Sequence, residues 1–217
     1  IRPHHVHLDA TLVVMLVQTL IVVLDETLAL FVRVDVDGHR PAHHGHAVVE
    51  GQYLLMVEIE QDVLECFLPL FGLDRGIELQ ILRQQVLELA DDVYHEDELF
   101  APVASGSHRF DAMIICPCSE STLAKISAGI ADNLVTRAAA VCLKERHKLV
   151  LVPRETPQSA IMLRNSLRLA EDGAVILPAS PGFYPRPQTV EDLVNFLVGK
   201  ILDQLGQPHE LFKRWGD

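Results

Sequence analysis

The chain has 217 residues, of which 49% are apolar, and its formal net charge is −12 at pH 7. This length and apolar content suffice for one α/β domain or two small domains with a buried core. The acidic balance argues against a nucleic acid or an anionic membrane as partner, although a local group of Arg and Lys can still bind an anionic ligand.

Residues 1–87 differ in character from the rest of the chain. They contain no Lys, seven of the eleven His, and long runs of Val and Leu. Their periodicity is mixed, because Leu20–Leu24 indicates a strand whereas Gly76–Ala90 has the apolar spacing of a helix. The stretch Leu12–Leu24 is short for a membrane span and lacks the basic flank of a signal peptide. We therefore interpret it as buried core and expect no membrane span.

Cysteine and histidine residues indicate neither a disulfide framework nor a metal site. The four Cys, at positions 66, 116, 118 and 142, lack the spacing of either. Thiols of this kind are usually reduced and packed, which favours a cytoplasmic location. The His-rich tract at residues 39–46 lacks Cys or ordered carboxylates, so we predict no bound metal.

Strand and helix patterns alternate from residue 88 onward. The apolar run Ala112–Pro117 predicts a buried strand. Ser119 or Ser121 can then cap a helix that continues to about Ile130. A second helix is predicted over residues 137–146.

The remaining elements repeat this order. Leu149–Val152 predicts a buried strand, after which Thr156 is expected to cap a helix that reaches about Glu171. Ala174–Leu177 predicts the next strand. Thr189 then caps a final helix, which Gly206 ends. Strands that alternate with helices predict an α/β fold whose parallel sheet is doubly wound.

Two charged residues, Arg154 and Glu155, follow the strand Leu149–Val152 directly after Pro153. Open α/β sheets bind their ligands outside the carboxyl ends of the strands. An Arg beside a Glu at that place offers a phosphate-binding fork and a proton carrier. The alternative, a solvent-exposed ion pair, contributes little to stability.

Six motifs occur in one order and at one spacing over residues 89–217, and they resemble those of the UbiX-like flavin prenyltransferases, formerly described as aromatic-acid decarboxylases. The motifs are Ala101–Ser107, Cys116–Ser119, Asp132–Ala139, Leu143–Arg146, Val152–Pro157 and Gly182–Pro187.

This resemblance implies a fold, a reaction and partners. The implied fold is a Rossmann-like flavoprotein domain, usually assembled as a dodecameric homo-oligomer. The implied reaction joins a dimethylallyl group from dimethylallyl phosphate to N5 and C6 of reduced FMN. The product would serve as cofactor for a UbiD-type decarboxylase.

The resemblance also implies roles for single residues. The segment Ser119, Glu120, Ser121 and Thr122 would contact FMN, as would Arg137. Lys144, Arg154, Tyr184 and Lys200 would bind the substrate phosphate, with Glu155 as proton carrier beside Arg154 and Lys144 in catalysis. Without the resemblance, Ser119–Thr122 is as readily an ordinary helix cap, and Arg137 a solvated helix residue.

Residues 1–87 lack the Gly-rich phosphate loop with which members of this family open. We therefore divide the chain into an atypical N-terminal segment, residues 1–87, and a flavoprotein-type α/β domain, residues 88–217. The segment is either a divergent half or the product of a different reading frame. Two alternatives to prenyl transfer follow: a related flavoprotein that decarboxylates peptidyl cysteines, and a non-catalytic chain that lacks half of the FMN site.

Overall fold

The computed structural model describes residues 28–34, 51–57, 90 and 92–216, and for the first two ranges only the backbone. The elements are the strands β1 (Leu28–Val34), β2 (Gly51–Val57), β3 (Asp92–His95), β4 (Ala112–Cys118), β5 (Lys148–Pro153) and β6 (Val175–Ile176), the 3-10 helix η2 (Pro102–Ala104), and the helices α4 (Glu120–Ser127), α5 (Leu134–Glu145), α6 (Ala160–Glu171) and α7 (Val190–Leu205). The interpretations of residues 12–24 and 76–89 and of the His-rich tract lie outside the described residues.

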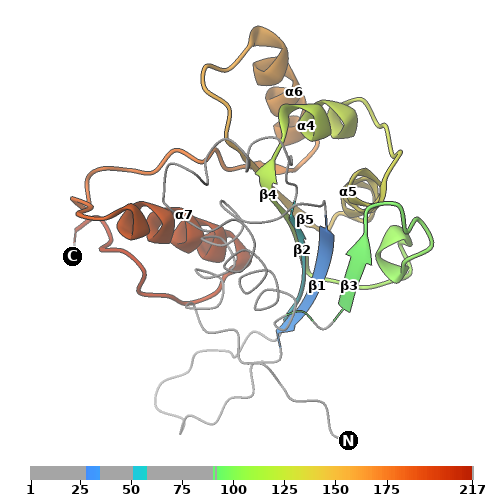
Figure 1. Ribbon diagram of the computed structural model, residues 1–217, viewed down its shortest axis with the longest axis horizontal. Helices are drawn as coiled ribbons and strands as arrows, with labels where there is room; N and C mark the ends of the chain where they lie inside the picture. Colours follow the sequence, from blue (N-terminus) through green and yellow to red (C-terminus); the bar gives the residue numbers. More distant parts are fainter. Residues whose placement is uncertain (1–27, 35–50, 58–89, 91, 217) are drawn as a thin grey trace, which may run out of the picture.

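The strands form one six-stranded sheet in the order β3-β1-β2-β4-β5-β6. β2, β4, β5 and β6 are mutually parallel, whereas β1 pairs antiparallel with both β2 and β3. Helices cover both faces of this sheet (Figure 1). The α/β fold with its parallel, doubly covered sheet is therefore confirmed, with an antiparallel part at one edge.

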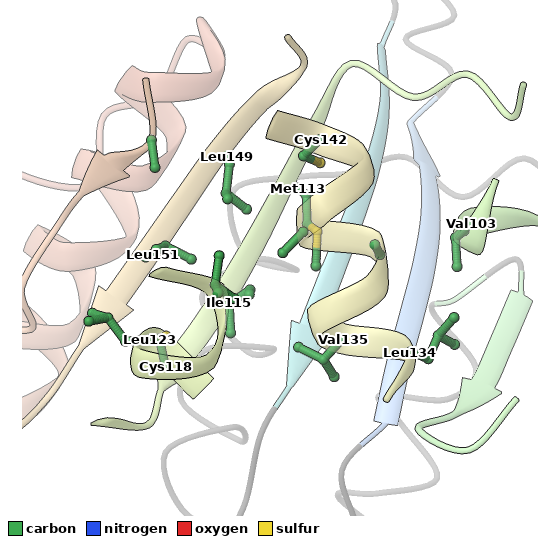
Figure 2. Close-up of a cluster of buried hydrophobic side chains, with 14 of the residues drawn as sticks. Val103, Met113, Ile115, Cys118, Leu123, Leu134, Val135, Cys142, Leu149 and Leu151 are labelled. Atoms are coloured by element: carbon green, nitrogen blue, oxygen red, sulfur yellow. The ribbon is translucent and has the colours of Figure 1, made fainter. Parts of the chain in front are cut away.

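Alternating side chains of β4 and β5 build the two cores. Met113 and Ile115 pack with Leu149 and Leu151 beneath α4 and α5, as Figure 2 shows. Their neighbours in the sequence point to the opposite face, where Ile114 belongs to the core beneath α7. Successive strand residues point to opposite sides of a sheet, so a continuous apolar run is the pattern that a strand covered on both faces requires.

Helix boundaries agree with the predicted caps in two of three cases. Ser119 caps α4, and Thr189 caps α7 through a capping box with Asp192. The prediction that Thr156 caps the helix after β5 was wrong, because Ser159 accepts the hydrogen bond from the Met162 N–H and α6 begins only at Ala160. Any hydroxyl in this stretch satisfied the sequence pattern, and the path of the chain away from β5 decides which one is used.

Two helices also differ in extent from the prediction. α4 ends at Ser127, so Ile130 lies beyond it in the connection to α5. α5 begins at Leu134, three residues earlier than predicted, because Asn133 and Thr136 form a capping box. The spacing of apolar residues continues beyond the end of α4 and begins only after the start of α5. Hydrogen bonds at the caps set the actual boundaries of both helices.

Candidate functional site

The carboxyl ends of β4 and β5 lie side by side. Cys118 pairs with Pro153 in the sheet register, so Ser119 and Arg154 are the first residues that leave the two strands. The next segment follows the same path, because the N–H of Ala179 donates to the carbonyl of Pro153 at 2.8 Å. Three segments therefore leave the sheet at one edge, which is where α/β folds of this type bind ligands.

Ser119 shapes the start of α4 at this edge. Its Oγ accepts a hydrogen bond from the Thr122 N–H at 3.1 Å and lies 2.9 Å from the Oγ of Ser121. The helix N-terminus and the exposed hydroxyl of Ser121 together suit an anionic or carbonyl-bearing group. The segment thus acts as a cap, with the exposed hydroxyl of Ser121 at its surface.

Glu120 connects this segment to the neighbouring loop. Its Oε1 accepts a hydrogen bond from the Oγ of Ser159 at 3.0 Å. Because Ser159 caps α6, the N-termini of α4 and α6 lie close together beside the ends of β4 and β5. Ser159 was not singled out from the sequence, where it is one hydroxyl among several.

Arg154 and Glu155 are exposed at the same edge. Neither forms a salt bridge with another residue in the described part of the chain, so the structure does not support the exposed ion pair as their role. Arg137 lies in the first turn of α5, where its Nε donates to the carbonyl of Ala104 at 3.4 Å. In Figure 2 this end of α5, marked by Val135, lies toward the Cys118 end of β4.

Lys144 lies at the other end of the sheet. α5 runs antiparallel to β5, so its last turn is next to the first residues of that strand, and Cys142 lies beside Leu149 and Met113 (Figure 2). A six-residue strand spans about 17 Å, which separates Lys144 from Arg154 within one chain. The expectation that both hold one phosphate is therefore not met inside a single copy. Sequence order could not show this, because it does not reveal which end of a helix meets which end of a strand.

Lys144 has its own surroundings. Its ammonium pairs with the carboxylate of Glu145, which lowers the pKa of Glu145 through that hydrogen bond. The side chain is 60% exposed and lines a groove of about 370 Å³ between α4 and α5.

Tyr184 lines a second cavity, of about 640 Å³, with the side chains of Arg186, Lys213, Arg214 and Trp215. Its ring meets those of Phe196 and Trp215 edge-on, with centroids 5.7 and 5.5 Å apart. Cationic and aromatic side chains that share one cavity suit a ligand with both an anionic and an apolar part.

Lys200 lies on α7 near this cavity. Its Nζ is 3.4 Å from the Oδ2 of Asp203, and Asp203 in turn binds Arg214, which lines the cavity. Burial raises the pKa of Asp203, but hydrogen bonds from Arg214 and His209 outweigh this and lower it to about 2. The structure thus brings Tyr184 and Lys200 to one region, separate from Lys144.

Sequence reasoning missed Arg186, Lys213 and Arg214. Lys213, Arg214 and Trp215 are consecutive, so a cationic and aromatic cluster is visible in the sequence. Nothing in that pattern shows that the chain turns back after α7 to meet the loop at Tyr184.

Cys116, Cys118 and Cys142 are buried, and none of them is in a disulfide within the described residues. Burial raises the pKa of Cys116 and of Cys142 to about 12, so both stay protonated at neutral pH and are unreactive as nucleophiles. Among residues 92–216, no three His, Cys, Asp or Glu side chains gather as a metal site. The described helices are each too short or too polar to cross a membrane.

Comparisons with known proteins place these features in a family. The sequence profile of the Flavoprotein family matches residues 46–202, and so extends N-terminally beyond the motifs found from residue 89. The flavin prenyltransferase UbiX of Thermoplasma acidophilum is 46% identical over 163 residues, which cover 75% of this chain and 84% of the relative.

Two solved structures are similar as well. A dodecameric FMN-dependent UbiX-like decarboxylase from Escherichia coli O157:H7 superposes with a TM-score of 0.60 at 48% identity, over 62% of this chain and 72% of the other. AnUbiX (PadA1) in complex with FMN and dimethylallyl pyrophosphate gives the same score and identity, over 62% and 71%. The chain therefore belongs to the Flavoprotein family, and within it to the UbiX-like flavin prenyltransferases.

Proposed function

We propose that this chain is a flavin prenyltransferase that transfers a dimethylallyl group from dimethylallyl phosphate to reduced FMN. The observation that carries the proposal is the pairing of Cys118 with Pro153, which brings the serine-rich start of α4 beside Arg154 and Glu155. Reduced FMN, when bound, supplies the nucleophilic N5 and C6 to which the prenyl group becomes attached.

In this proposal the residues at the sheet edge have different roles. The segment Ser119–Thr122 holds the flavin with N–H and hydroxyl groups, and Arg137 supports it from α5. Arg154 holds the phosphate through its planar fork, which stabilises the charge that develops as this group leaves. Glu155 carries a proton between the flavin and the departing phosphate. Tyr184 and Lys200 contact the same phosphate.

Lys144 enters the site only if a second copy supplies it. Within one copy it lies at the opposite end of β5 from Arg154, and its exposed ammonium is accessible to a neighbour. We therefore propose a homo-oligomer, with a dodecamer as the expected size. Leu163 and Leu167 on α6 support an assembly, because they are 52% and 60% exposed and lie four residues apart on one helix face.

The product would go to a UbiD-type decarboxylase, and the reaction would take place in the cytoplasm. Reduced thiols at Cys116, Cys118 and Cys142 agree with a reducing compartment.

Mass spectrometry of the flavin tests the proposal directly. The purified chain is incubated anaerobically with reduced FMN and dimethylallyl phosphate. The expected product is FMN with one added C5H8 unit, together with inorganic phosphate. A flavin of unchanged mass, from a chain shown by its absorption spectrum to contain FMN, would refute the proposal. A chain that binds no FMN would support the non-catalytic alternative.

A further inference from the structure

Asp203, in the last turn of α7, receives three cationic or hydrogen-bonding partners. Arg214 binds it as a fork, with Nη2 at 2.8 Å from Oδ1 and Nη1 at 3.3 Å from Oδ2. Lys200 lies 3.4 Å from Oδ2. The Asp203 side chain is only 20% exposed, so these contacts are shielded from water more than those of a surface ion pair.

His209 is the third partner, and its hydrogen bonds define its protonation. The backbone N–H of Leu211 donates to Nδ1 at 3.3 Å, so Nδ1 carries no proton. The ring proton is therefore on Nε2, which donates to the Oδ1 of Asp203 at 3.0 Å. Nε2 also lies 3.3 Å from the Nη2 of Arg214, and the His209 side chain has no exposed surface. It binds Asp203 as a buried hydrogen-bond donor.

Aromatic packing also holds residues 209–215 against α7. Phe212 packs on Phe196 and on His209, with ring centroids 4.9 and 5.3 Å away. Gly199 permits this approach, because a Cβ there would lie 2.5 Å from Phe212 and 2.6 Å from His209. Residues 209–215, which we call the C-terminal segment, are therefore held on α7 by Asp203 and by aromatic contacts.

The C-terminal segment provides one wall of the cavity at Tyr184. Lys213, Arg214 and Trp215 line it together with Tyr184 and Arg186. In the part of the chain that the structure describes, neither Arg186 nor Lys213 forms a salt bridge, so the cavity keeps an excess of positive charge after Asp203 has paired. This wall exists only while the segment stays on α7.

We propose that Asp203 is a positioning residue for an anion site in this cavity. It holds the C-terminal segment so that Lys213, together with Arg186, faces the phosphate of a ligand whose apolar part packs against the outer faces of Tyr184 and Trp215. The proposal rests on the proposed function insofar as that ligand is the prenyl phosphate. Asp203, His209 and the C-terminal segment have no part in that function as stated above.

Two variants separate positioning from simple electrostatics. Asp203→Asn removes a negative charge near the cavity, so electrostatics alone predicts tighter anion binding, whereas loss of positioning predicts weaker binding. His209→Leu changes no charge and no lining residue, so any loss of affinity reports the position of the segment. Glu210→Gln is the matched control, because Glu210 is an exposed neighbour with the same charge change.

The experiment measures the binding of inorganic phosphate and of dimethylallyl phosphate to the full chain by calorimetry. We expect Kd for both anions to rise about tenfold in Asp203→Asn and in His209→Leu, as loss of a hydrogen bond to a charged group implies, and to stay unchanged in Glu210→Gln. Trp215 is the only Trp in the chain and is already 85% exposed, so its fluorescence anisotropy, which reports mobility, is measured and should fall in the same two variants.

Each other outcome has a defined meaning. Tighter binding by Asp203→Asn with unchanged binding by His209→Leu would overturn the proposal, as would unchanged Trp215 anisotropy in both. Wild-type protein that binds neither anion would overturn it as well. If Asp203→Asn fails to fold, His209→Leu decides. If the wild type binds phosphate in an Asp203-dependent way but forms no prenylated flavin, the proposed function fails and the role of Asp203 stands.

Discussion

At the scale of single residues, Arg154 and Asp203 represent opposite arrangements of charge. Arg154 is exposed at a strand end with no acidic partner in the described residues, so its guanidinium is available to a phosphate. Asp203 is bound by Arg214, His209 and Lys200, so its carboxylate is fully occupied within the chain. The first arrangement suits ligand binding, and the second suits the fixing of a segment.

Arg154→Lys should weaken the binding of dimethylallyl phosphate. Lys keeps the charge but cannot bind two phosphate oxygens with a planar fork, so we expect KM to rise about tenfold with little effect on FMN binding. Steady-state formation of prenylated flavin measures KM, and flavin fluorescence measures FMN binding. Arg164→Lys on the exposed part of α6 is the control. Equal effects of both substitutions would argue against a specific role for Arg154.

The docking of the C-terminal segment should depend on pH through Asp203. The pKa of Asp203 is lowered from 3.8 to about 2, so its contribution is fully present above 3.8 and is lost as the pH falls through about 2. Trp215 fluorescence should therefore change in this acidic window, and the change should be absent in Asp203→Asn. A transition of the same midpoint in both proteins would show that another group is responsible.

At the scale of secondary structure, β4 and β5 determine where the site lies. Their register sets Ser119 beside Arg154, and their alternating side chains anchor both strands in two cores. The loops that carry the polar residues can therefore vary without loss of the sheet edge beneath them. Stability and ligand binding are supported by different atoms of the same strands.

Truncation of a strand side chain should destabilise the domain. Leu151 is completely buried in β5, so Leu151→Ala should lower the free energy of unfolding by about 2–5 kcal/mol through the cavity that it leaves. Leu99, which is 44% exposed, provides the matched control, and Leu99→Ala should change stability by less than about 0.5 kcal/mol. Chemical denaturation measures both. Similar losses in the two variants would contradict this assignment of the core.

At the scale of the whole molecule, the proposed site requires more than one copy of the chain. Arg154 and Lys144 occupy opposite ends of β5, while Tyr184 and Lys144 line different cavities. A site that uses all three side chains can form only where copies meet, with one end of the sheet of one copy against the other end of the next. Such a contact is heterologous, and contacts of this kind generate a ring when the rotation between copies closes.

Mixed assemblies test this arrangement. Arg154→Ala and Lys144→Ala should each lower the rate of prenyl transfer by about a hundredfold, because each removes a cation that stabilises the leaving phosphate. Co-expression of the two variants should restore about a quarter of the sites, since random mixing joins two intact contributors at that frequency. Light scattering first confirms that the assemblies have the same size, and the rate of prenyl transfer is then measured on each. No recovery on mixing would show that Lys144 acts within its own copy or not at all.

The sequence alone determined the strands β4 and β5, the ends of α7 and the family, whereas it did not predict β3 or the start of α6. Apolar runs located β4 and β5, hydroxyl and glycine residues located the ends of α7, and the six motifs identified the family that the comparisons confirmed. These features depend on neighbours in the chain, whose chemistry a sequence displays directly. The roles of Ser119–Thr122, Arg137 and Glu155 remain predictions.

Only the tertiary structure decided which distant side chains meet. It placed Glu120 against Ser159, brought Arg214 back to Asp203, and set the last turn of α5, which carries Lys144, at the opposite end of β5 from Arg154. Each of these relations depends on the direction in which a helix returns along the sheet and on where the chain folds back after it. Such directions follow from packing between residues far apart in the chain, and no periodicity or short motif records them.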